Sequence, residues 1–450
     1  MKTRGLAAAA LAASIGLTAC SGGAGQPAGD LPAIPNAAAA ASPIKHVILM
    51  IQENRSFDDL FATYPGADGA TAGKCHHLHG TRDFTYPLHK APLLAKVAAS
   101  YAYGNFAYDV DGGKMDGFCD AIQPPYGRVP YQYVDPADIK PYWTIAQQYV
   151  LTDRLFTTMG SGSFTAHQDL IRGNTALTPQ ESDVDNPSDT PWGCGAPPGT
   201  VTDLLLSNGT YEARKGPFPC FTYRTLRDLL DAKGVSWKYY TPATELAGST
   251  GGIWNAFFAI KQVYDGPEWK SNVTNSAPYE MQIFDDIDNG KLPAMSWVIP
   301  DAYNSDHPGE AQDTGPSWVA AVVNAVGKSQ YWDSTAIIVV WDDWGGFYDH
   351  VPPPKLSYYS AGLRVPGLIV SPYVSKGRVD HTQYVFGSIL EYVEDTFGLG
   401  HLGTTDVGVN SIGADFDYGQ APRAFVPISA TYSRESLRRR PESRLPVDTY

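Results

Sequence analysis

The chain has 450 residues, enough for up to three domains of roughly 150 residues each or for one large α/β domain with long insertions. Hydrophobic residues make up 43% and charged residues 18%, which allows a sizeable core and argues against intrinsic disorder. The formal net charge is −14, so we expect no nucleic-acid partner. No apolar run reaches the roughly 18 residues that a membrane-spanning helix needs.

The N-terminus has the layout of a secretory signal peptide, which we predict over residues 1–19. A positive start precedes an apolar run, residues 6–17, that is too short to span a bilayer. Residues 17–20 resemble the lipobox of bacterial lipoproteins, in which Cys20 becomes the lipid-modified N-terminus; an ordinary cleaved signal peptide is the alternative. Residues 20–43 are rich in Ala, Gly, Pro and Ser and predict a flexible tether. We therefore expect an exported protein, either secreted or held in the cell envelope, whose membrane contact is limited to the lipid on Cys20.

Four further cysteines support export: Cys75, Cys119, Cys194 and Cys220. An even number in an exported protein suggests two disulfides. Because Cys194 and Cys220 bracket a Gly/Pro-rich segment, we expect the pairs 194–220 and 75–119. Four free buried thiols are the alternative, which an oxidising compartment disfavours.

Apolar runs alternate with helix-like stretches along most of the chain. Strands are expected at residues 45–51, 236–240, 295–299, 336–341 and 366–370, and helices at residues 223–233, 317–329 and 384–397. This order predicts βαβ units, and so an α/β fold with a mostly parallel central sheet covered by helices on both faces. Residues from about 60 to 135 and from 174 to 220 are expected to be loop-rich insertions or lids, and residues 401–450 a peripheral C-terminal segment.

Acidic and amide side chains follow two of these strands. Glu53 and Asn54 come after the first strand, and Asp342 and Asp343 after the strand at 336–341. Ligand sites of parallel sheets gather beyond the carboxyl ends of the strands, so these four side chains are expected at one rim. Such an oxygen-rich set suits a hard divalent cation such as Mg²⁺, Ca²⁺ or Mn²⁺. For any one of these Asp residues the alternative is a helix N-cap.

Five blocks of sequence, in this order, resemble motifs of the bacterial phosphoesterase family that contains phospholipases C and certain acid phosphatases. They are residues 45–58 (KHVILMIQENRSFD), 112–118 (GGKMDGF), 300–308 (PDAYNSDHP), 341–351 (WDDWGGFYDHV) and 364–373 (RVPGLIVSPY). The resemblance implies an alkaline-phosphatase-like α/β fold and a catalytic domain that we place at residues 44–400. It also implies that Glu53 and Asn54 form the first pair of metal ligands, and Asp342 and Asp343 the second.

The same resemblance implies a Ser or Thr nucleophile, also a metal ligand, within residues 161–168. Thr165 fits the family pattern best and Ser163 is the fallback, while Gln168 stands where the family usually has Asn. A hydroxyl at a helix N-terminus benefits from the helix dipole, and a metal that contacts it lowers its pKa. The alternative for Thr165 is a helix N-cap.

His307 and His350 match histidines near the family's phosphate pocket, where they bind substrate or assist the transferring phosphoryl group. A structural histidine in a loop is the alternative, and it applies more strongly to His350. A further family histidine is missing here, because residues 100–104 read SYAYG. A transition-metal site at residues 75–79 (CHHLH) is disfavoured, since Cys75 is expected in a disulfide. Arg55 and Lys114 could pair with phosphate or form ordinary ion pairs.

The sequence therefore predicts an exported, metal-dependent phosphoric ester hydrolase, of the acid phosphatase or phospholipase C type, that works through a Thr or Ser phospho-enzyme intermediate. Its substrate would be a phosphate ester and could be a phospholipid. The chain lacks the long C-terminal extension of the larger phospholipases of the family, which slightly favours a phosphatase-like enzyme. A non-catalytic surface-binding lipoprotein on a degenerate scaffold is the alternative.

Overall fold

The computed structural model describes residues 42–76, 83–94, 99–120, 128–244, 250–274, 281–309, 313–357, 361–441 and 443. The expected signal peptide, Cys20 and most of the tether lie outside these residues. All of the structure discussed below belongs to the unit that begins at Ala40. Within its described part, no helix has the length and apolar character that crossing a membrane requires.

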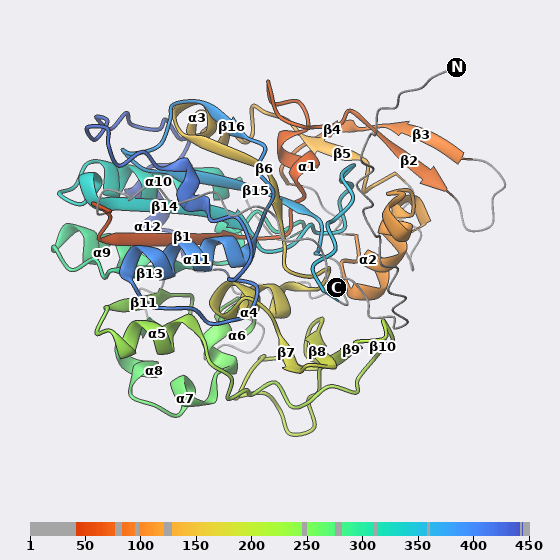
Figure 1. Cartoon of the computed structure of the whole chain (residues 1–450). Coiled ribbons are helices and arrows are strands. Elements are labelled where there is room, and N and C mark those ends of the chain that lie inside the picture. Colours follow the sequence, from red (N-terminus) through yellow and green to blue (C-terminus); the bar gives the residue numbers. More distant parts are fainter. Residues whose placement is uncertain are drawn as a thin grey trace, which may run out of the picture. The chain divides into compact units, whose positions relative to one another are not determined.

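A nine-stranded sheet forms the centre of this unit (Figure 1). Its strands follow the order β12-β11-β13-β1-β14-β15-β6-β16, with β17 also paired to β6. The bounds of these strands are β1 (His46–Gln52), β6 (Val150–Phe156), β11 (Trp237–Tyr240), β12 (Val273–Thr274), β13 (Met295–Val298), β14 (Thr335–Trp341), β15 (Arg364–Val370), β16 (Arg378–Asp380) and β17 (Tyr384–Val385). All neighbouring strands are parallel except β15, which is antiparallel to both β14 and β6.

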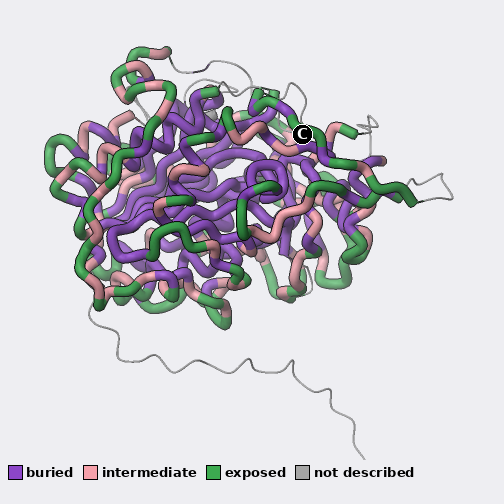
Figure 2. The backbone as a smooth tube through the Cα atoms, turned by 90° about the horizontal axis from the view of Figure 1, so that it is seen from above, coloured by how far each residue is buried: buried purple, intermediate pink, exposed green. Residues whose placement is uncertain are grey.

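Burial of both sides of the central strands explains why their sequences are continuous apolar runs rather than alternating ones. Every residue of β14 and β15 is buried, and so are residues 47–52 of β1. Figure 2 shows that the interior of the unit is buried and is surrounded by more exposed segments. Pro366 interrupts β15 where its register with β6 shifts, which is a position where a sheet tolerates proline.

Helices in two groups accompany the sheet: α10 contacts α3, α9 and α12, whereas α4 contacts α5 and α11. The bounds of the helices are α1 (Phe57–Phe61), α2 (Tyr103–Val110), α3 (Lys140–Gln148), α4 (Ser163–Arg172), α5 (Leu226–Ala232), α6 (Thr250–Ile253), α7 (Lys261–Tyr264), α8 (Glu268–Ser271), α9 (Gln282–Asp288), α10 (Gly315–Gly327), α11 (Phe386–Phe397) and α12 (Arg434–Arg438). The α/β class with a mostly parallel sheet, expected from the sequence, is confirmed.

The two stretches expected to be loop-rich contain small sheets. Strands β2 (Ala72–His76) and β3 (Asp83–Pro87) form one hairpin, and β4 (His89–Ala91) pairs with β5 (Gln132–Val134). The second stretch forms a four-stranded antiparallel sheet from β7 (Ala176–Thr178), β8 (Glu181–Val184), β9 (Asp203–Leu206) and β10 (Tyr211–Glu212). These strands are only two to five residues long, so their sequences carry little periodic signal.

Two disulfides fix these insertions, and both have the pairing expected from the sequence. Cys75 bonds to Cys119, and Cys194 bonds to Cys220. The first ties β2 to the segment after α2, and the second ties the loop before β9 to the segment that leads into α5. The C-terminal segment packs on α10, where the side chain of Asn324 exchanges hydrogen bonds with the main chain of Ile428.

Candidate active site

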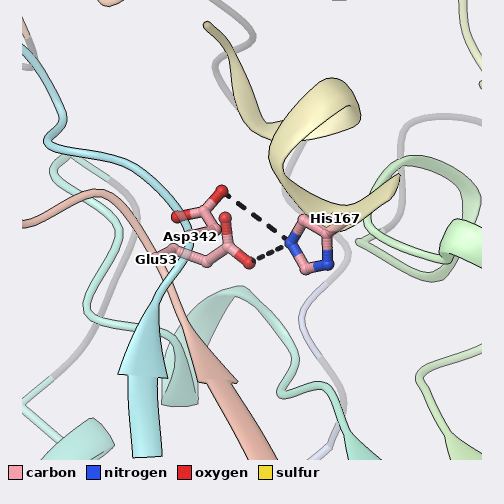
Figure 3. Close-up of side chains that lie close together, drawn as sticks. All are labelled: Glu53, His167 and Asp342. Atoms are coloured by element: carbon pink, nitrogen blue, oxygen red, sulfur yellow. Dashed lines mark hydrogen bonds and ion pairs between the residues drawn. The ribbon is translucent and has the colours of Figure 1, made fainter. Parts of the chain in front are cut away.

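The ends of β1 and β14 bring the first acidic residues of the site together. The two strands are parallel neighbours with Gln52 opposite Trp341, so Glu53 and Asp342 follow at the same edge of the sheet. Both side chains reach His167 of α4, whose Nε2 lies 2.8 Å from Oε1 of Glu53 and 3.8 Å from Oδ2 of Asp342 (Figure 3). One ligand atom from each of these three residues lies within 4.8 Å of the others, a grouping that could hold a metal ion.

Asn54 and Asp343 complete the rim through hydrogen bonds between the two loops. The main-chain N–H of Asn54 donates to Oδ1 of Asp342 over 2.9 Å, and Nδ2 of Asn54 donates to Oδ2 of Asp343 over 3.1 Å. Asn54 has a left-handed backbone (φ 60°), which Asn adopts more readily than most residues. A side chain at Gly345 would meet the Asn54 carbonyl at 2.1 Å, so this close approach requires glycine.

Helix α4 contributes a hydroxyl to the same group of side chains. Ser163 is the first residue of the helix, and its Oγ donates to Oδ2 of Asp343 over 3.2 Å. His167 lies four residues further on, and residues at this spacing share one face of a helix. Thr165, two residues from Ser163, points elsewhere: its buried hydroxyl donates to the main-chain oxygen of Asp185 over 3.1 Å. The structure thus gives Ser163, not Thr165, the position beside the carboxylates.

Burial and like charge dominate the electrostatics of the site. Burial raises the pKa of Glu53 well above its usual value, and the nearby charge of Asp342 raises it further. The pKa of Asp343 is raised in the same direction, by burial and then by the charge of Asp342. Burial lowers the pKa of His167 to about 4, so its imidazole is neutral near pH 7 and contributes no positive charge.

These residues fit a hard divalent cation. Oxygen atoms of Glu53 (Oε2), Asn54 (Oδ1) and Asp342 (Oδ2) are buried without a hydrogen-bond partner in the described part of the chain. Nor does any Lys or Arg among the described residues form an ion pair with Glu53, Asp342 or Asp343. Buried carboxylates need a compensating positive charge, and carboxylate, amide and hydroxyl oxygens are the ligands that Mg²⁺, Ca²⁺ and Mn²⁺ prefer.

His307 is fully buried and rigidly held. Its Nδ1 lies 2.9 Å from the Pro308 carbonyl oxygen, and its ring stacks on Trp254 with ring centres 5.7 Å apart. Tyr101 packs edge-on against the same ring at 6.4 Å. Residues 100–104, which lack the histidine expected from the family resemblance, therefore supply an aromatic contact to His307 instead.

His350 lies in a different cluster, at the exposed end of an ion-pair network. Its Nδ1 is 2.7 Å from Oδ2 of Asp58, and its Nε2 is 3.3 Å from Oδ1 of Asp68. The buried guanidinium of Arg364 bonds Asp58 and Asp349 in the same network. The structure therefore does not bring His350 to Glu53 and Asp342, and its contacts match the structural alternative. Asp58, Asp349 and His350 could also group around a cation, but Arg364 already supplies the positive charge there.

The remaining candidate residues lie in ordinary ion pairs or disulfides. Arg55 is buried and pairs with Asp59 at 2.9 Å, and Lys114 is exposed and pairs with Asp111 at 2.6 Å. Cys75 is in a disulfide, so the sequence at 75–79 offers no thiolate to a metal; His77 and His79 lie outside the described residues.

His167 was not singled out from the sequence. Its spacing of four residues from Ser163 was the available signal, because it predicts a shared helix face.

A cavity of about 150 Å³ opens at Gly162, the residue before Ser163. Its wall comes from the residues before α2 and from the β7–β10 insertion; the lining residues include Tyr101, Asp185, Asp203, Tyr211 and Arg214. Asp185 anchors this wall, because its Oδ1 accepts hydrogen bonds from the main-chain N–H groups of Tyr103 and Gly162. A larger cavity of about 640 Å³, between α10 and the C-terminal segment, shares no lining residue with it.

The chain is similar to known proteins over most of its length. The sequence model of the Phosphoesterase family matches residues 44–400. The chain belongs to the Phosphoesterase family. This phosphoesterase is therefore a phosphoric ester hydrolase. It is 24% identical to phospholipase C B of Mycobacterium tuberculosis over 446 residues, which cover 85% of this chain and 80% of that protein.

Two further relatives carry related names. Identity to the non-hemolytic phospholipase C of Burkholderia pseudomallei is 25%, over 79% of this chain and 55% of that protein. Identity to non-specific phospholipase C1 of Arabidopsis thaliana is 23%, over 88% of this chain and 75% of that protein. Among solved structures, a protein of the alkaline phosphatase superfamily from Vibrio parahaemolyticus is 11% identical with a TM-score of 0.37, over 80% of this chain and 69% of that chain.

Proposed function

We propose that this phosphoesterase hydrolyses phosphate esters through a phosphoserine formed on Ser163. The observation that carries the proposal is the 3.2 Å hydrogen bond from Ser163 Oγ to Asp343, within the buried group that also contains Glu53 and Asp342. It favours Ser163 over Thr165, whose hydroxyl bonds a main-chain oxygen instead. A helix N-terminus also presents unpaired N–H groups to a phosphoryl oxyanion.

A divalent cation held by Glu53, Asn54, Asp342, Asp343 and Ser163 would supply positive charge to the phosphoryl oxygens and lower the pKa of the Ser163 hydroxyl. Ser163 Oγ then bonds to phosphorus as the ester P–O bond breaks. The hydroxyl proton moves to Oδ2 of Asp343, its existing acceptor, and the leaving alkoxide takes a proton from water. Water hydrolyses the phosphoserine, which restores the hydroxyl and releases inorganic phosphate from a monoester or a phosphomonoester from a diester.

The substrate class follows from the relatives and from the cavity. Several relatives are named phospholipase C, so we propose that the substrates include the phosphodiester of a phospholipid. The cavity at Gly162 adjoins the nucleophile and would hold the organic group on one side of the phosphate. The complete set of carboxylates and hydroxyl speaks against a non-catalytic binding protein on this scaffold.

The test compares a chromogenic phosphate monoester, a chromogenic phosphocholine diester and phosphatidylcholine vesicles, each with chelator and with added Mg²⁺, Ca²⁺ or Mn²⁺. We expect metal-dependent turnover of at least one substrate and, after acid quenching, a phosphorylated peptide whose modified residue is Ser163. Phosphate found on Thr165 would overturn the choice of nucleophile. No turnover of any substrate with metal supplied would overturn the enzymatic proposal.

We also propose that the protein is exported and carries lipid on Cys20. The signal-like N-terminus supports export, and so do the two disulfides, which persist in oxidising compartments. The mature protein from its native host should fractionate with membranes and should become soluble in the Cys20→Ser variant. An unmodified N-terminus at another residue would contradict lipidation.

A further inference from the structure

Asn255 is a buried amide whose hydrogen-bonding groups are unused. The residue is 4% exposed, and neither Oδ1 nor Nδ2 has a partner among the described residues. It occupies the N-cap of the short 3₁₀ turn at residues 256–259. An Asn side chain at an N-cap normally accepts a hydrogen bond from a main-chain N–H of the first turn, but Asn255 makes no such bond. Buried polar groups without partners are rare in folded proteins, and each calls for an explanation.

The neighbours of Asn255 on both sides are attached to the active site. The ring of Trp254 stacks on His307. The carbonyl of Ala256 accepts a 2.9 Å hydrogen bond from Nε2 of Gln168, the residue after His167 on α4. Asn255 therefore lies between a residue that contacts His307, which the family resemblance assigns to the phosphate pocket, and a residue that contacts α4, which carries Ser163.

Tyr239 of β11 bonds the main chain of the same segment, on both sides of Asn255. Its hydroxyl donates to the Trp254 carbonyl over 3.1 Å and accepts from the Ala256 N–H over 3.2 Å. These two hydrogen bonds hold the backbone on either side of Asn255 against β11.

Thr241 adds a second unused donor near this segment. Its hydroxyl is fully buried and has no partner within the described ranges. It lies two residues beyond Tyr239, at the carboxyl end of β11, and alternate residues of a strand face the same side. Asn255 and Thr241 are both neutral donors, which suits a ligand rich in acceptor oxygens.

We propose that Asn255 is a substrate-binding residue whose Nδ2 donates a hydrogen bond to a non-bridging phosphoryl oxygen of the bound ester. This inference rests on the proposed function, since it assumes that the phosphoryl group binds between Ser163 and His307. A phosphoryl oxyanion would supply the acceptor that Asn255 does not find among the described residues, and the hydrogen bond would orient phosphorus toward Ser163. Bound substrate would then provide the hydrogen-bond partner for the amide of Asn255.

The test uses the metal-loaded enzyme and the variant Asn255→Leu, which keeps the approximate volume and removes both polar atoms. We expect an unchanged or higher melting temperature, because a buried polar group without partners is lost. We also expect KM for the chromogenic ester and the inhibition constant for inorganic phosphate to rise roughly ten- to a hundredfold, the range for a hydrogen bond to a charged ligand. Asn255→Asp should bind phosphate still more weakly, since it places a carboxylate against the oxyanion.

Asn324→Leu is the matched control. Asn324 is a partly buried amide with both groups bonded to Ile428, so this variant should lose stability and keep its KM and its affinity for phosphate. An Asn255→Leu enzyme with wild-type KM and phosphate affinity would overturn the proposal. Calorimetric measurement of phosphate binding to the wild type and to Asn255→Leu distinguishes a failure of the proposed hydrolysis from a failure of the proposed role of Asn255. Binding of phosphate without turnover of any ester would contradict the hydrolysis, and the difference in affinity between the two proteins would still test Asn255. A wild type that binds no phosphate overturns both.

Discussion

Ser163 and Asp343 are joined by a 3.2 Å hydrogen bond from the serine hydroxyl to Oδ2 of the carboxylate. This contact links the first turn of α4 to the loop after β14, two elements 180 residues apart in the chain. Because His167 shares the helix face of Ser163, the same contact also brings the imidazole to Glu53. The orientation of α4 about its own axis therefore determines that the hydroxyl of Ser163, and not that of Thr165, faces the carboxylates.

Replacement of the two hydroxyls should give opposite results. Ser163→Ala should lower kcat by roughly three orders of magnitude or more while the fold is kept, since it removes the nucleophile. Thr165→Val should keep kcat within a few-fold and lower the free energy of unfolding by about 1–3 kcal/mol, because the buried Asp185 carbonyl loses its donor. Steady-state kinetics and urea unfolding measure both, and Thr165→Ser is the conservative control. A folded, inactive Thr165→Val beside an active Ser163→Ala would refute the assignment.

Metal removal should abolish activity and reduce stability. The carboxylates of Glu53, Asp342 and Asp343 repel one another when they are ionised together, so a cation that binds only the native state stabilises it. At a metal concentration of 100 Kd the gain is about 2.7 kcal/mol. Thermal unfolding with chelator and with added Mg²⁺, Ca²⁺ or Mn²⁺ measures the shift. Asp342→Asn should remove most of the response; an undiminished shift in that variant would place the metal elsewhere.

The Asp58–His350 pair should make stability depend on pH. Burial alone lowers the pKa of His350, but the hydrogen bond and charge of Asp58 outweigh it, so the pKa lies above the usual 6.5. The stabilisation is fully present below the unfolded pKa, near 6.5, and is lost as the pH rises through the raised folded value. His350→Gln should therefore cost more stability at pH 5.5 than at pH 9, by on the order of 1 kcal/mol.

Urea unfolding of wild type and His350→Gln at several pH values tests this dependence. The side chain of His350 is 27% exposed, so solvent screens part of the interaction. The matched background is Asp58→Asn, in which the pH-dependent effect of His350→Gln should become smaller without vanishing, because Asp68 and Asp349 remain near the imidazole. A larger cost at high pH than at low pH would have the wrong sign for this pair.

The disulfide between Cys194 and Cys220 should stabilise the wall of the cavity at Gly162. It closes a loop of 26 residues, and Cys194 also donates a main-chain hydrogen bond to Phe258, close to Asn255. The double variant Cys194→Ala/Cys220→Ala should lose about 3 kcal/mol of stability. Thermal unfolding measures the loss, and KM should rise more than kcat falls, because the 254–260 segment is loosened while Ser163 is not. An unchanged melting temperature would contradict this account.

The sheet and the acidic rim formed by Glu53 and Asp342 could be predicted because they rest on local signals. The apolar runs at 45–51 and 336–341 have no helical periodicity, and both appear as buried parallel strands. Once these strands are neighbours, Glu53 and Asp342 must meet at their carboxyl ends. No such rule covers the short strands of the insertions, whose pairing depends on contacts that a local pattern does not encode.

Three features of the candidate site could not be predicted, because they depend on the orientation of a helix or on contacts between residues far apart in the sequence. The choice between Ser163 and Thr165 needed the phase of α4, for which His167 was the one sequence marker. His350 stands in a motif next to the acidic pair, yet its partners are Asp58 and Asp68, which precede β2 in the chain. Asn255 carried no signal at all, because an asparagine in a loop is ordinarily exposed, and only tertiary packing buries it.

The β7–β10 insertion, which lines the cavity at Gly162, contributes no carboxylate to the group of Glu53, His167 and Asp342 that could hold a metal ion. The proposed catalytic side chains lie at strand ends and on one helix, whereas the cavity beside them is lined by this separate insertion, which the Cys194–Cys220 disulfide ties to the segment before α5. Replacing the β7–β10 insertion by that of a relative with a different substrate preference should therefore change which esters are bound. It should leave cleavage of the P–O bond intact.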